Sequence, residues 1–99
     1  MSTLGLVSHI DSCLGWARRL DAKGSSPQTR QIVERLEEMR SQAVKTGGVF
    51  HCGDGRLGLS RWWSGDWGVE SWGDEGAALM EEVSKLQAFV DKHWKEFPR

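Results

Sequence analysis

The chain has 99 residues, a formal net charge of −1 and two cysteines. That length suits a single domain, residues 1–99, with one modest hydrophobic core. The near-neutral charge excludes a general nucleic-acid binder that relies on bulk positive charge. Two cysteines are too few for a disulfide framework, and no apolar run approaches the roughly 20 residues of a membrane span. We therefore expect a cytoplasmic protein.

Two helices are predicted at the start of the chain, over residues 3–22 and 27–46, because apolar residues recur there at three- and four-residue spacing. Either Thr3 or Ser8 could cap the first helix. Ser26 is the expected N-cap of the second helix, followed by Pro27 at its first position. The connection is short enough to predict an antiparallel helical hairpin. The inner stripe predicted for the second helix is Ile32, Val33, Leu36, Met39, Ala43 and Val44.

The segment between Gly47 and Gly73 holds four of the six tryptophans and is rich in glycine. Asp54-Gly55 suits a type I′ turn and Gly65-Asp66 a type II′ turn, so the sequence predicts three antiparallel strands. The expected strands cover residues 48–53, 56–64 and 67–72. Their register sets Trp62 opposite Val69.

A third helix is predicted over residues 75–97, with Gly73-Asp74 at its N-cap. The expected fold class is therefore α+β, in the order α-α-β-β-β-α, with a small three-stranded antiparallel meander packed against the helices. Six acidic residues and no basic one lie between Asp66 and Glu82. Those at the start of the third helix are expected mainly to complement its N-terminal dipole.

Alternation of side chains across the predicted sheet separates two faces. The inner face centres on Leu59 and includes Trp63. The second face is either covered by a helix or open to a partner. If it is open, its apolar patch is the candidate partner-binding site, and tryptophan is typical of binding hot spots. The residues of this candidate site are Val49, His51, Trp62, Trp67 and Val69.

No catalytic, cofactor or metal signature emerges from the reactive residues. His9 and Cys13 share a helix face, but adjacent strand residues such as His51 and Cys52 point to opposite sides and do not complete a four-ligand zinc site. Cys52 would be buried, and it lacks a base and an orienting group. We expect no enzyme activity, no cofactor and no metal.

The sequence thus favours a small non-enzymatic protein–protein interaction module. Its size matches that of phage-borne inhibitors and immunity proteins, which block larger partners, and this comparison rests on size and composition alone. The alternative is a binder of single-stranded nucleic acid or a small ligand that uses the same aromatic sheet face. Steep salt dependence would distinguish nucleic-acid binding from an apolar protein contact. The identity of the partner and the oligomeric state are left open.

Overall fold

The computed structural model describes residues 3–46, 62 and 67–93. Three long helices account for most of this part: α1 (Thr3–Lys23), α2 (Pro27–Thr46) and α3 (Asp74–His93). A short 3₁₀ helix, η2 (Val69–Ser71), precedes α3. None of the helices described is long and apolar enough to cross a membrane.

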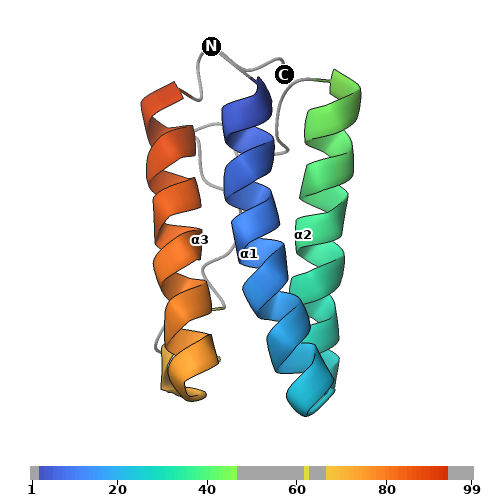
Figure 1. Ribbon diagram of the computed structural model, residues 1–99, viewed down its shortest axis with the longest axis vertical. Coiled ribbons are helices and arrows are strands. Elements are labelled where there is room, and N and C mark those ends of the chain that lie inside the picture. The colour runs from blue at the N-terminus through green and yellow to red at the C-terminus, as the bar shows by residue number, and fades with distance from the viewer. Residues whose placement is uncertain (1–2, 47–61, 63–66, 94–99) are drawn as a thin grey trace.

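Helix α1 lies between α3 and α2 and contacts both of them (Figure 1). It runs in the opposite direction to its two neighbours, so α2 and α3 run the same way. The residues just before α2 and just before α3 consequently lie at the same end of the bundle, beside the end of α1. We call this end the base.

Each long helix buries residues at alternating three- and four-residue spacing, the pattern of helices that pack side by side at a shallow angle. This spacing keeps one face of each helix against its neighbours over the whole length. The buried rows are Leu6, Ile10, Cys13, Ala17 and Leu20 in α1; Thr29, Ile32, Leu36, Met39 and Ala43 in α2; and Gly76, Leu79, Val83, Leu86 and Val90 in α3.

The start of α2 is fixed by a reciprocal cap. The backbone N–H of Thr29 donates to Ser26 Oγ at 3.1 Å, and the N–H of Ser26 donates to Thr29 Oγ1 at 2.8 Å. The Thr29 hydroxyl also donates to Asp21 Oδ1 at 2.8 Å, which ties the last turn of α1 to the first turn of α2. The prediction of Ser26 as N-cap and Pro27 as first helical residue is confirmed.

The predicted α+β fold class is wrong, because no strand occurs in the part of the chain that the structure describes. The third predicted strand, residues 67–72, is instead a turn containing η2. Gly68 has φ 57° and ψ 46°, a left-handed conformation that ends any extended run. The N–H of Ser71 then bonds to the carbonyl of Gly68 at 2.9 Å, so local bonds replace cross-strand pairing.

The other two predicted strands lie outside the described residues, apart from Trp62, which has 3₁₀-helical rather than extended conformation. Trp62 and Val69 were predicted to pair across two strands, on a face either covered by a helix or open to a partner, and both belong to the buried core. Trp72 and Trp67 are partly buried and pack against this core. Within the described residues, the core is therefore built from three helices and the tryptophans packed among them, and it contains no sheet.

Candidate functional site

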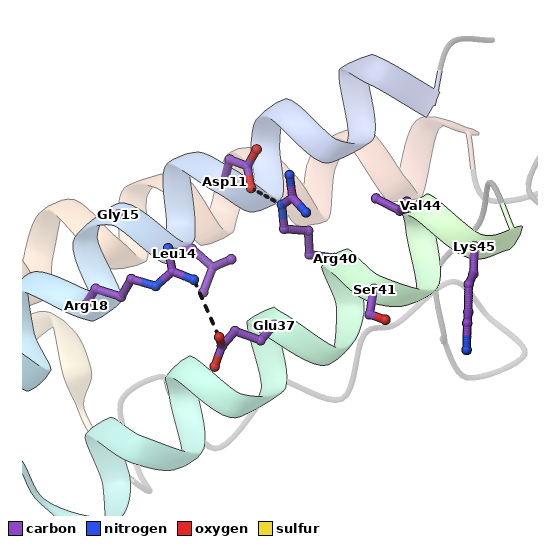
Figure 2. Close-up of a pocket in the computed structure, with 9 residues that line it drawn as sticks. All are labelled: Asp11, Leu14, Gly15, Arg18, Glu37, Arg40, Ser41, Val44 and Lys45. Atoms are coloured by element: carbon purple, nitrogen blue, oxygen red, sulfur yellow. Dashed lines mark hydrogen bonds and ion pairs between the residues drawn. The ribbon is translucent and has the colours of Figure 1, made fainter.

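A groove runs between α1 and α2 along the outside of the bundle, with a volume of about 650 Å³ (Figure 2). We call it the α1–α2 groove. It forms because the two antiparallel helices bury their inner rows and leave the longer polar side chains at the edges. Its lining residues are Asp11, Leu14, Gly15, Arg18, Glu37, Arg40, Ser41, Val44 and Lys45.

Two ion pairs cross the α1–α2 groove from one helix to the other (Figure 2). Arg40 Nε lies 2.6 Å from Asp11 Oδ1, and Arg18 Nη2 lies 3.5 Å from Glu37 Oε2. All four side chains are about half exposed, so each pair contributes roughly 0–1 kcal/mol to stability. They place one acid and one arginine on each edge of the groove, Asp11 and Arg18 on α1 and Glu37 and Arg40 on α2.

Lys45 adds a positive charge at the end of the groove. This lysine has no ion-pair partner within the described residues. With two arginines, two acids and this lysine, the lining carries a net charge of +1.

Of two apolar residues that line the groove, one is buried and the other is exposed to solvent. Leu14 is buried, whereas Val44 is 61% exposed. Among the described residues Val44 is the large hydrophobic residue that is exposed to solvent. At Gly15, a Cβ would meet no atom within 4 Å, so the groove is open above this residue.

Val44 was predicted to lie on the inner stripe of α2, and this prediction is wrong. The buried row of α2 follows strict three- and four-residue steps from Thr29 to Ala43, and the next residue falls outside it. Counting that spacing strictly, with Thr29 included, would have placed Val44 on the surface.

The site residues predicted from the sequence lie elsewhere. Trp62 is 4% exposed and Val69 is fully buried, so neither is accessible in this structure. Trp67 is partly exposed, and its carbonyl accepts a hydrogen bond of 3.1 Å from Trp72 Nε1. Val49 and His51 fall outside the described residues. The structure therefore brings Trp62 and Val69 together in the core and not on an open face.

A smaller hollow of about 460 Å³ opens at the base of the bundle. Trp72 and Leu20 contribute its apolar surface, and an ion pair of 2.6 Å between Lys23 and Glu75 stands at its edge. The hydrogen bond from Lys23 lowers the pKa of the Glu75 carboxyl below its ordinary value. The charges of this hollow are therefore paired with each other.

Two reactive residues of α1, Cys13 and His9, pack within the helical bundle. Burial, followed by the negative charge of Glu82, raises the pKa of the Cys13 thiol to about 12, so the thiol stays protonated at neutral pH. His9 stacks against Phe89, with ring centroids 4.9 Å apart. Within the described residues no group of three histidine, cysteine or acidic side chains is placed to hold a metal ion.

Comparisons with known proteins add no assignment: no family model, no curated protein and no solved structure matches this chain.

Proposed function

We propose that this chain is a small non-enzymatic protein–protein interaction module, and that its α1–α2 groove is the surface that meets the partner. The observation that carries the proposal is the exposure of Val44 beside a groove whose edges are crossed by two ion pairs. A preformed groove lowers the entropy cost of binding, because few side chains need to be ordered.

The partner that fits this groove best is an amphipathic helix. Such a helix would place one apolar side chain against Val44 and pass close to α1 at Gly15, where no side chain stands in the way. A carboxylate of the partner would pair with Lys45. The polar sides of the helix would meet the arginines and acids at the edges, which favours one orientation over the other.

A module of this kind acts by covering a surface of a larger protein, and we therefore propose an inhibitory role, for which the support is the small size of the chain. The protonated state of Cys13 supports a non-enzymatic role, because a buried neutral thiol is a poor nucleophile. We place the protein in the cytoplasm, a reducing compartment where such a thiol remains free.

The nucleic-acid alternative depended on an aromatic sheet face that would stack bases. Trp62 is in the core, and residues 67–72 do not form a strand. No observation in the described residues favours this alternative over a protein partner.

The test is affinity capture from the native host with two matched variants. Val44→Asp places a charge in the apolar wall of the groove, and Ala88→Asp places the same charge on the exposed side of α3. Both positions are exposed, so both variants should fold. We expect a host protein that is captured by the wild type and by Ala88→Asp, and at least about tenfold less by Val44→Asp.

A photo-crosslinking amino acid at position 44, with position 88 as control, then shows whether the contact is direct. Adducts should form from position 44 and not from position 88. Equal capture by Val44→Asp and Ala88→Asp would rule out the groove as the binding surface.

A further inference from the structure

The outward face of α1 has a pattern of charge that is symmetric about its central residue, Gly15. Exposed residues lie three, four and seven positions to either side of it. Those before Gly15 are Ser8, Asp11 and Ser12, and those after it are Arg18, Arg19 and Ala22. The face is therefore acidic or small in its first half and basic or small in its second half. We call these residues, with Gly15, the α1 face.

This pattern is complementary to itself in one orientation. If a second copy of α1 crosses the first in the antiparallel direction at Gly15, Asp11 of each copy lies opposite Arg19 of the other. Ser8 then lies opposite Ala22, and Ser12 lies opposite Arg18. A parallel pairing would place Asp11 on Asp11 and arginine on arginine, which is unfavourable.

The groups that would pair across this contact are available. Asp11 uses Oδ1 for Arg40, and no contact among the described residues uses its second oxygen. The guanidinium of Arg19 lies 4.8 Å from the centre of the Trp16 ring, and no ion pair among the described residues includes it, although its charge helps to lower the pKa of Glu75. The stacking on Trp16 keeps this guanidinium near the helix surface, with its N–H groups free to donate.

Gly15 permits the close approach that the crossing requires. An exposed glycine inside a helix costs about 1 kcal/mol relative to alanine. Nothing in the packing of the described residues needs it, because a Cβ at this position would meet none of their atoms within 4 Å. A second backbone that passes close to this point would explain why a residue without a side chain stands here.

We propose that this chain self-associates as an antiparallel, two-fold symmetric dimer through the α1 face, with Asp11 of each copy paired to Arg19 of the other. A two-fold contact uses the same patch on both copies and closes at two, so no larger assembly results. A single crossing of helices buries a small area, so the dimer is weak and forms with rising concentration. The α1 face shares Asp11, Gly15 and Arg18 with the α1–α2 groove, and dimerisation therefore competes with the partner of the groove. This competition rests on the proposed function, whereas the dimer does not.

Sedimentation velocity of the full chain at about 10 µM to 1 mM tests the proposal. We expect the wild type to shift from monomer to dimer in this range. Arg19→Asp and Asp11→Arg should each weaken association by about tenfold or more, because the symmetry doubles every like-charge contact. The double variant, Asp11→Arg with Arg19→Asp, restores both pairs in reverse and should dimerise again.

Gly15→Leu provides a second test that does not depend on charge. The open space at this position should let the variant fold, and the added side chain should block the crossing. A far-UV circular dichroism melt checks that each variant is folded. A wild type that stays monomeric throughout, or a folded double variant that does not recover, would overturn the dimer. Val44→Asp should leave dimerisation intact. The dimer proposal and the proposal of partner binding at the α1–α2 groove can therefore fail independently of each other.

Discussion

At the scale of single residues, two helical glycines have opposite structural roles. Gly76 is buried at the start of α3, where a Cβ would overlap the carbonyl oxygen of Val69 and lie 3.0 Å from Trp72 Cβ. It is what allows η2 to pack directly on α3. A Cβ at Gly15 would instead meet no atom of the described residues within 4 Å. One glycine is required by packing and the other is not.

Replacing each glycine by alanine should therefore change stability in opposite directions. Gly76→Ala is expected to lower the free energy of unfolding by about 1–3 kcal/mol, since backbone must move to admit the methyl group. Gly15→Ala is expected to raise it by up to about 1 kcal/mol through helix propensity. Urea unfolding measures both. A Gly76→Ala variant as stable as the wild type would show that η2 does not pack on α3 as described.

At the scale of elements, the last turn of α1 contacts both neighbouring helices at the base. Asp21 accepts a hydrogen bond from Thr29 at the start of α2, and Lys23 pairs with Glu75 in the first turn of α3. Asp74 and Glu75 also complement the positive end of the α3 dipole, as the sequence predicted. Further along α3, Lys85 lies 3.4 Å from Glu82. Part of the acidic segment is thus neutralised within the chain.

The Lys23–Glu75 pair should make stability depend on pH in the acidic range. The pKa of Glu75 is lowered in the folded chain, so its contribution is fully present above the unfolded value of about 4.3 and is lost as pH falls through the folded value. Glu75→Gln should be less stable than the wild type at pH 7, and the difference should vanish at lower pH. Thermal melts of both proteins from neutral to acid pH measure this. A difference that is the same at every pH would show that the carboxylate charge contributes nothing.

The helices could be predicted from the sequence because periodicity and capping chemistry agree in them. The predicted bounds of the first two differ from the observed ones by a residue at most. The third begins one residue early, at Asp74, and its predicted end at residue 97 lies outside the described residues. Residues 67–72 could not be predicted in the same way. Alternating apolar and small residues fit a strand, but left-handed Gly68 and the bonds of Ser71 and Trp72 to preceding carbonyls favour a tight turn.

At the scale of the whole molecule, the expected binding surface depended on the strand that was wrongly predicted over residues 67–72. A strand register sends Trp62 and Trp63 to opposite faces, and the prediction of an open tryptophan face depended on it. In the structure, Trp62 and Val69 contribute to the same core as the three helices. No aromatic residue is among the described residues that line the α1–α2 groove, and its signal in the sequence was only the position of Val44 outside a strict row. The exposed position of Val44 can be recognised only when the buried row of α2 is known.

The central claim is that Trp62 belongs to the helical core, which leaves the helices to supply the interaction surface. The free energy of unfolding of Trp62→Ala in urea, measured beside Val44→Ala, tests it most directly. We expect Trp62→Ala to lose about 3–5 kcal/mol, as truncation of a buried aromatic does, and Val44→Ala to change by no more than about 0.5 kcal/mol. A Trp62→Ala variant that unfolds at the same urea concentration as Val44→Ala would place Trp62 on the surface and contradict the account.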